Sequence, residues 1–287
     1  MKRALVLGGG GAVGIAWEAA IIGGLLDAGV DLRRADLIVG TSAGSVVGTH
    51  LAHGADPREV LGRREAAAAR GGRPASDTEA LTAVFSIWGT AAEMTAEVCA
   101  RIGEVALGAR TMPEETWLRG FAGNGWPGWP DKPLVITAVD CDSGAFRAFD
   151  RDSGVPIELA AAASCAVPGM FPPVTIAGGR YMDGGVRSGT SGDLAQRIEP
   201  DVVLMLSPMG ARGLTGLIAR QLAREKGELE AAGASVKIMQ FDDAAREAGA
   251  ANLMDHARVS PVAVAGAAHA ARLAGELRDW WDGRGAR

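Results

Sequence analysis

The chain has 287 residues, of which 48% are hydrophobic and 22% charged, and its formal net charge is −5. This composition is typical of a globular protein with a substantial core, and the absence of a long lysine and arginine run argues against a nucleic-acid partner. Its three cysteines, Cys99, Cys141 and Cys165, are too few and too far apart for a disulfide framework or a zinc site. We therefore expect a soluble cytoplasmic protein with reduced thiols.

The first fifty residues alternate between apolar runs and helical patterns. Residues 4–7 predict a buried strand, followed by a glycine loop at 8–11 and a helix from about 14 to 28. A second strand at 36–39 leads through Gly40 into another helix. This order predicts parallel strands covered by helices. No segment has the roughly 20 uninterrupted apolar residues of a membrane span.

The middle of the chain is mostly helical. From 56 to about 118 the pattern is rich in alanine, glutamate and arginine, with a loop at 70–74 and a new helix starting at 113–115. Residues 120–133 are rich in glycine and proline and predict a loop or lid that carries Trp126 and Trp129.

The remaining elements continue the alternation of strands and helices. We expect one domain over residues 1–287 with a three-layer α/β/α sandwich around a mainly parallel sheet. The predicted elements are a strand at 134–139, a partner strand at 145–149, a helix at 156–165, a hairpin of 174–176 and 180–182 turned by Gly178-Gly179, strands at 202–206 and 236–239 separated by a long helix, and a last helix from Ser260-Pro261 past Trp280.

A Gly-x-Ser-x-Gly pattern stands where the second predicted strand meets its helix. Gly40 and Gly44 flank Ser42 and allow a sharp turn that presents the serine oxygen above the sheet. The following helix N-terminus favours developing negative charge there. Ser42 is therefore a candidate nucleophile, whereas a simple helix cap is the alternative interpretation.

The glycine loop after the first strand is the second candidate feature. Consecutive glycines let backbone N–H groups point into a site, where they can hold an oxyanion. Gly9, Gly11 and Gly14 also match the dinucleotide fingerprint G-x-G-x-x-G. A dinucleotide site needs an acidic residue at the end of the second strand, and that strand ends instead in residues 40–42. This weakens the dinucleotide interpretation.

Two later segments complete the pattern. Asp183, followed by Gly184 and Gly185, could reach the serine from a strand end, although Asp-Gly-Gly by itself is also a common turn. A free aspartate is a weak base, with a pKa near ~3.9, so it would need desolvation or a short hydrogen bond. Residues 164–174 are apolar and proline-rich, which suits either the wall of an acyl pocket or a structural corner.

In order and spacing, these motifs resemble the patatin-like phospholipases over about residues 4–210. The resemblance implies a lipid acyl hydrolase with a Ser42–Asp183 dyad, a covalent acyl-serine intermediate, and neither a metal nor an organic cofactor. It further implies an oxyanion hole formed by the backbone amides of Gly10, Gly11 and Ala12. One position departs from the family pattern, because Val13 stands where a lysine or arginine is usual. Val13 removes a cation but leaves the amides, so we expect the hole to survive.

Two other functions stay open at this point. An α/β-hydrolase triad could join Ser42 and Asp183 to His256 or His269, although Ser42 comes unusually early in the chain for that fold. A lipid- or nucleotide-binding module could use the glycine loop without any chemistry. The dyad interpretation predicts a lipid or acyl-ester substrate, allows peripheral membrane contact, and leaves the oligomeric state undefined.

The tryptophans are candidate lipid contacts. Trp126 and Trp129, inside the predicted loop, are better candidates for an interfacial surface than Trp88 and Trp117, which we expect to pack in the core. The pair Trp280-Trp281 is expected to dock the last helix.

Overall fold

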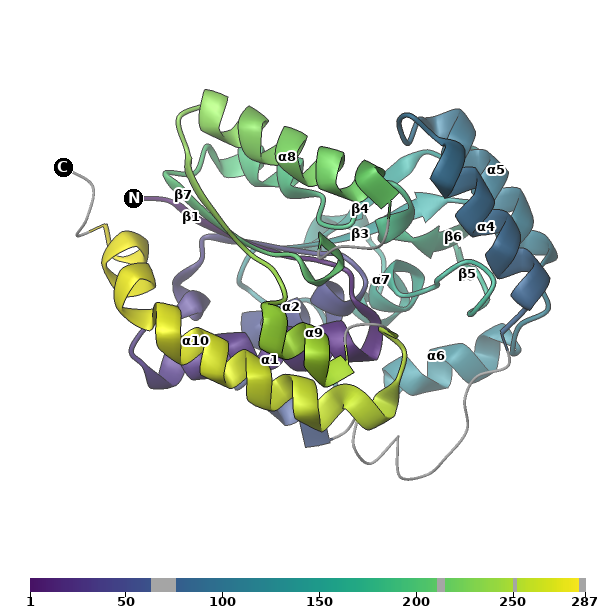
Figure 1. The fold of residues 1–287 in the computed structure, drawn as a ribbon. Helices are drawn as coiled ribbons and strands as arrows, with labels where there is room; N and C mark the ends of the chain where they lie inside the picture. The colour runs from purple at the N-terminus through teal and green to yellow at the C-terminus, as the bar shows by residue number, and fades with distance from the viewer. Residues whose placement is uncertain (63–75, 211–214, 250–251, 284–287) are drawn as a thin grey trace.

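The fold is a twisted sheet with helices on both faces (Figure 1). The computed structural model describes residues 1–62, 76–210, 215–249 and 252–283, so the predicted loop at 70–74 lies outside the described residues. Within them the sheet has eight strands in the order β5-β6-β3-β2-β1-β7-β8, with β4 also paired to β3. The strands are β1 (Arg3–Leu7), β2 (Leu37–Gly40), β3 (Leu134–Asp140), β4 (Phe146–Phe149), β5 (Val174–Ile176), β6 (Gly179–Asp183), β7 (Val202–Leu206) and β8 (Ser235–Met239).

The strands from β3 to β8 along the sheet run parallel, whereas β4, β5 and β6 pair antiparallel at the other edge. The fold class predicted from the sequence, a three-layer α/β/α arrangement around a mainly parallel sheet, is confirmed. The helices are α1 (Gly11–Asp27), α2 (Ala43–Ala52), α4 (Thr78–Thr90), α5 (Ala96–Gly108), α6 (Glu114–Ala122), α7 (Ile157–Ser164), α8 (Thr215–Ala231), α9 (Asp243–Gly249) and α10 (Val259–Trp281).

Alternating side chains of each central strand enter two different cores. In β1, Leu5 and Leu7 pack on the face covered by α1, α2, α7 and α10, whereas Ala4 and Val6 face α8. Figure 1 shows α1 and α10 on one side of the sheet and α8 on the other. Because both faces are covered, the strands read as continuous apolar runs rather than as an alternating pattern.

Several element boundaries differ from the predictions by one to three residues. Helix α1 begins at Gly11 instead of about residue 14, and α10 begins at Val259, just before the predicted Ser260-Pro261 start. The hairpin turns at Ala177-Gly178 instead of Gly178-Gly179, because Ile176 pairs with Gly179. Both turn residues have positive φ, 49° and 85°, which matches the twist of a tight hairpin.

The topology brings the predicted site residues to one end of the sheet. Strands β1 and β2 are parallel, so the glycine loop and the Ser42 turn leave the same edge. Strand β6 runs against β3, and its last residue, Asp183, pairs with Ala138, close to the level of Gly40, which pairs with Ile136. Segments far apart in the sequence therefore converge there.

The predicted lipid-contact role of the loop tryptophans is wrong for Trp126. Its side chain is only 7% exposed and packs edge-on against the ring of His50. The Trp129 indole is half-buried and donates a hydrogen bond to the Val155 carbonyl at 2.7 Å. Trp126 is therefore a core residue, and Trp129 is partly exposed.

The C-terminal tryptophans dock the last helix, as predicted. Trp281 is buried and its indole donates to the Asp31 carbonyl at 3.1 Å. In the described part of the chain, no helix combines the length and the apolar character that crossing a bilayer requires.

Candidate active site

Ser42 occupies a sharp turn between β2 and α2. Its backbone has φ 52° and ψ −115°, an unusual conformation for a residue with a side chain. A Cβ on Gly44 would lie 2.1 Å from the Leu7 carbonyl oxygen, and one on Gly40 would lie 2.7 Å from the Gly44 oxygen. Both flanking glycines are therefore required by close backbone approach, as the Gly-x-Ser-x-Gly pattern predicts.

The backbone of Ser42 is held from the end of α7. The Ser42 amide donates to Ser164 Oγ at 2.9 Å, and Cys165 Sγ donates to the Ser42 carbonyl at 3.2 Å. Ser45 Oγ donates to the same carbonyl at 2.7 Å. Backbone strain of this kind persists only where the surroundings hold it. The sequence did not indicate these roles, since Ser164 is 122 residues from Ser42 and no motif joins them.

Asp183 lies against Ser42. Asp183 is 4% exposed; its carboxylate accepts the Gly185 amide at 2.7 Å and interacts with the Ser42 side chain, which lowers its pKa. Burial raises the pKa of Asp183 to about 7, against the lowering effect of these two interactions. A Cβ on Gly184 would lie 2.2 Å from Thr137 Oγ1, so the chain after Asp183 needs a glycine. Asp183 thus both starts a turn and contacts the predicted nucleophile.

The amides of the glycine loop divide into two groups. Gly8 donates to the Leu206 carbonyl at 2.9 Å and Gly9 to the Gly189 carbonyl at 2.8 Å. Among the described residues, the amides of the next three positions engage in no hydrogen bond; these are Gly10, Gly11 and Ala12. They are the N-terminal amides of α1, which an α-helix leaves without internal partners. These are the three amides that the resemblance assigns to an oxyanion hole.

The loop lies beside Ser42 and under the segment that precedes α10. A Cβ on Gly9 would be 3.5 Å from the Ser42 Cβ. Gly11 has φ 59°, and a Cβ there would be 2.5 Å from Met254 Sδ, so position 11 requires a glycine twice over. A Cβ on Gly14 would make only ordinary van der Waals contacts, with its nearest neighbours at 3.5 Å, so this position does not require a glycine. The Gly14 amide donates to the Gly10 carbonyl at 2.7 Å.

Val13, where the family usually has a cation, is fully buried in the core. Its amide donates to the Leu253 carbonyl at 3.0 Å and is therefore engaged, unlike the three amides that precede it. The valine side chain therefore anchors α1 by apolar packing. The role of residues 253–254 over this loop was missed from the sequence, because that region carries no recognisable pattern.

One further amide near Ser42 escaped the sequence analysis. Within the described ranges, no hydrogen bond uses the N–H of Ala43, the first residue of α2. The N-termini of α1 and α2 both carry the partial positive charge of a helix dipole. Together they create a favourable environment for an anion beside Ser42.

Three histidines make contacts away from Asp183. The His50 ring packs on Trp126, and His53 lies between the carbonyls of Thr49 and Gly128. His269 lies 3.8 Å from Asp242, and burial lowers its pKa. His256 belongs to a short 3-10 helix, His256–Arg258. In the part of the chain that the structure describes, the side-chain partner of Asp183 is a serine rather than a histidine.

The proline-rich segment 164–174 packs as a corner next to α6. Phe171 is buried and stacks on Trp117, with ring centroids 4.0 Å apart. The Trp117 indole donates to the Ala162 carbonyl at 3.1 Å. These contacts support the structural interpretation of the segment, while its first two residues, Ser164 and Cys165, contact Ser42.

Comparisons with known proteins place these residues in a wider context. A family model described as Patatin-like phospholipase matches residues 5–191. Similar solved structures include VipD from Legionella pneumophila, at 12% identity and a TM-score of 0.44, and the type III effector protein ExoU, at 16% and 0.43. The similarity covers 96% of this chain in both cases, but 67% of VipD and 53% of ExoU. A comparison with curated proteins finds no match.

Proposed function

This chain belongs to the patatin-like phospholipase family, and on that premise we propose that it hydrolyses acyl esters of lipids through a covalent acyl intermediate on Ser42. The observation that carries the proposal is a buried carboxylate, Asp183, that interacts with the Ser42 side chain and whose pKa burial raises to about 7. A carboxylate with that pKa can accept a proton at neutral pH and return it within one turnover.

In the first half of the reaction, Ser42 Oγ attacks the acyl carbonyl carbon while Asp183 takes the hydroxyl proton. The carbonyl π bond opens and leaves a tetrahedral intermediate with a negative oxygen. When this intermediate collapses, the bond to the leaving alcohol breaks and Asp183 returns its proton to that oxygen. The product of this half is an ester between the acyl group and Ser42.

The second half repeats these steps with water. Asp183 takes a proton from a water molecule, whose oxygen attacks the acyl-Ser42 carbonyl. Collapse of the second tetrahedral intermediate breaks the bond to Ser42 Oγ, which regains its proton from Asp183. The acid is released and the site is restored without a metal or an organic cofactor.

The unengaged amides at the start of α1 suit the charge that develops in both intermediates. Among the described residues, the N–H groups of Gly10, Gly11 and Ala12 have no hydrogen-bond partner, and the two glycines carry no side chain of their own. A preorganised donor of this kind typically contributes about 2.7–4 kcal/mol to the stabilisation of the transition state. The strained turn at Ser42 places the nucleophile next to the glycine loop, because a Cβ on Gly9 would lie 3.5 Å from the Ser42 Cβ.

A fluorophosphonate labelling experiment tests the proposal. We expect one covalent adduct per chain on Ser42 of the wild type, identified by mass spectrometry, and none in Ser42→Ala. Ser86→Ala provides a matched control, because Ser86 is an exposed serine of α4 remote from the Asp183 contact. A folded wild-type protein that takes up no label would refute the hydrolase and favour a non-catalytic binding module.

Substrate assays define the class of ester. Hydrolysis should be measured on a panel that runs from short p-nitrophenyl esters to diacyl phospholipids presented in vesicles. We expect turnover on lipid esters, and cosedimentation with the vesicles would test the peripheral membrane contact that such a substrate implies.

A further inference from the structure

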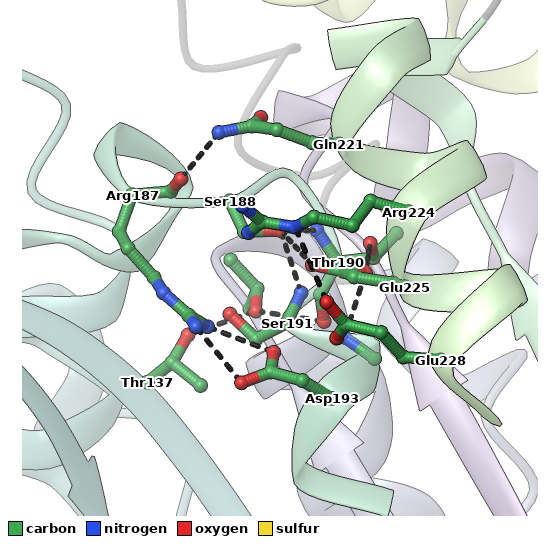
Figure 2. A network of polar contacts seen from close by, with 12 residues as sticks. Thr137, Arg187, Ser188, Thr190, Ser191, Asp193, Gln221, Arg224, Glu225 and Glu228 are labelled. Carbon is green, nitrogen blue, oxygen red and sulfur yellow. Dashed lines mark hydrogen bonds and ion pairs between the residues drawn. The ribbon is translucent and has the colours of Figure 1, made fainter. Parts of the chain in front are cut away.

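Glu225 of α8 is a buried carboxylate that the proposed reaction does not use. It is 1% exposed, and its three hydrogen-bond donors all come from one loop, residues 188–192 (Figure 2). Ser188 Oγ donates to Oε1 at 2.5 Å, Thr190 Oγ1 donates to Oε2 at 2.5 Å, and the Gly192 amide donates to Oε2 at 2.8 Å. Burial of a carboxylate is costly unless such bonds compensate it, so this arrangement demands an explanation.

The cation nearest in the sequence to this loop does not pair with Glu225. Arg187 forms a two-pronged ion pair with Asp193, with both distances at 2.8 Å. Figure 2 shows the Arg187 side chain directed at Asp193, while Gln221 of α8 reaches the Arg187 carbonyl. The hydrogen-bond donors of Glu225 are therefore neutral: two side-chain hydroxyls and one backbone amide of the loop 188–192.

The bond from Ser188 fixes the conformation of that loop. Because the Ser188 hydroxyl donates to Glu225, its oxygen is left to accept from the amides of Thr190 at 3.2 Å and Ser191 at 3.0 Å. Ser191 has φ 53°, a left-handed conformation that is uncommon for a residue with a side chain. The carboxylate thus stabilises a loop shape that the local sequence does not favour.

The same loop contacts both parts of the proposed active site. The Gly189 carbonyl accepts the amide of Gly9, the residue just before the unengaged amides. The Thr190 carbonyl accepts a hydrogen bond from Thr41 Oγ1 at 3.4 Å, next to Ser42. These contacts form a continuous path from Glu225 to the oxyanion loop and the nucleophile turn.

We propose that Glu225 is a positioning residue that, through the loop 188–192, holds the Gly9 amide and so aims the amides of Gly10, Gly11 and Ala12 at the reacting ester. This inference rests on the proposed function and extends it to α8, which lies beyond the residues 5–191 that the family model matches. A purely structural network would stabilise the fold without any effect on the reactivity of Ser42.

The variant Glu225→Gln separates these two roles. Glutamine keeps the size of the side chain but replaces one acceptor oxygen with an NH₂ group, which cannot accept a hydrogen bond. Whichever way the amide turns, either the Ser188 hydroxyl or the Thr190 and Gly192 donors lose their acceptor. We expect kcat for a soluble p-nitrophenyl ester to fall about tenfold, a loss of roughly 1.4 kcal/mol, with KM changed less than twofold. Fluorophosphonate labelling of Ser42 should slow by the same factor.

The matched control is Glu228→Gln, one turn along α8. Glu228 is half exposed and forms an i,i+4 ion pair with Arg224 at 3.7 Å, so the variant should keep the wild-type kcat. A lower melting temperature of Glu225→Gln with kcat per folded molecule unchanged would assign Glu225 a structural role only and overturn the proposal.

A second pair of variants decides the question if Glu225→Gln does not fold. Thr190→Val removes the hydroxyl that donates to Glu225 and keeps the shape, whereas Thr190→Ser keeps the hydroxyl. We expect Thr190→Val to lose kcat severalfold and Thr190→Ser to recover most of it. Equal, wild-type rates in both variants would refute the positioning role.

Hydrogen exchange supplies a readout that does not need activity. In a variant that breaks the network, either Glu225→Gln or Thr190→Val, the Gly9 amide should exchange about tenfold faster, and in Glu228→Gln it should be unchanged. If the wild type were inert toward esters and fluorophosphonate, the proposed hydrolase would fail. The Gly9 exchange rate would still test the link to Glu225, and unchanged exchange would overturn it.

Discussion

Asp183 and Glu225 are both buried carboxylates whose pKa is raised by burial. The chain that follows Asp183 leads directly into the loop 188–192, which binds Glu225. The two carboxylates differ in the number and kind of their hydrogen-bond partners. Glu225 binds two hydroxyls and an amide of a loop that also bonds to itself. Asp183 accepts the Gly185 amide and interacts with a single hydroxyl, that of Ser42, which lies next to the glycine loop.

The difference indicates how one chemical group serves as a base or as an anchor. The protons around Glu225 are held by groups with no other reaction to undergo, and three donors favour its charged form. The proton of the Ser42 hydroxyl can move to Asp183, because the serine oxygen then attacks the ester and the negative charge passes to the ester oxygen. That oxygen is stabilised by helix N-termini. Burial raises both pKa values, but only the surroundings of Asp183 offer a reaction.

The largest effect is expected from Asp183→Asn, which tests the contrast between the two carboxylates. Asparagine keeps the shape but cannot accept the Ser42 proton, so kcat should fall by about 10² to 10⁴, against about tenfold for Glu225→Gln. The measurement is the steady-state rate per folded molecule. Asp183→Asn with more than a tenth of the wild-type kcat would contradict the base and the contrast with Glu225.

Asp183→Asn should lower kcat but should not lower the stability of the fold at neutral or higher pH. The pKa of Asp183 rises from roughly 3.9 in the unfolded chain to about 7 in the fold, so the wild type loses stability as pH rises between these values. Asparagine does not ionise, and Asp183→Asn should be at least as stable as the wild type above pH 7. Its melting temperature at pH 8 also shows whether the loss of kcat reflects unfolding.

The pH dependence of the reaction provides the next test. Because the proposed base must be ionised, kcat/KM should rise with pH and level off above about 7, which makes the rate at pH 5 roughly a hundredfold lower. Glu225→Gln should lower the whole profile and leave its midpoint in place. A plateau already present at pH 5 would show that Asp183 has an ordinary pKa or is not the base.

The smallest effect is expected from the histidines. His269→Ala and His256→Ala should keep kcat within about threefold of the wild type, because the Asp183 carboxylate interacts with Ser42 and Gly185. Both variants are measured with the same ester as Asp183→Asn. A loss as large as that of Asp183→Asn in either one would replace the dyad with a Ser-His-Asp triad.

Much of the fold could be predicted because its signals are local. Apolar runs marked the central strands, and the order of strand and helix indicated a parallel sheet, which the structure confirms. The turn at Ser42 was also predictable, because only glycine tolerates the close approach at Gly40 and Gly44. Boundaries moved by a few residues at α1, where the helix starts within the glycine loop.

The supporting residues of the site could not be found in this way. Ser164 is 122 residues from Ser42, and Glu225 is 33 to 37 residues from the donors it binds. A serine at a helix end and a glutamate in a charged helix carry no local signal of these partners. Trp126 was misjudged for the same reason, because a tryptophan in a glycine and proline loop gives no indication of the His50 ring that covers it.

By itself, the sequence determined the order of the strands and helices, the sharp serine turn and the run of amides free of side chains, since backbone geometry and residue type are local properties. Only the tertiary structure decided which amides remained unengaged, how strongly burial raised the pKa of Asp183, and which carboxylate held the loop. Those properties depend on the partners and the water that packing brings together or excludes, and neighbours in the sequence do not specify them.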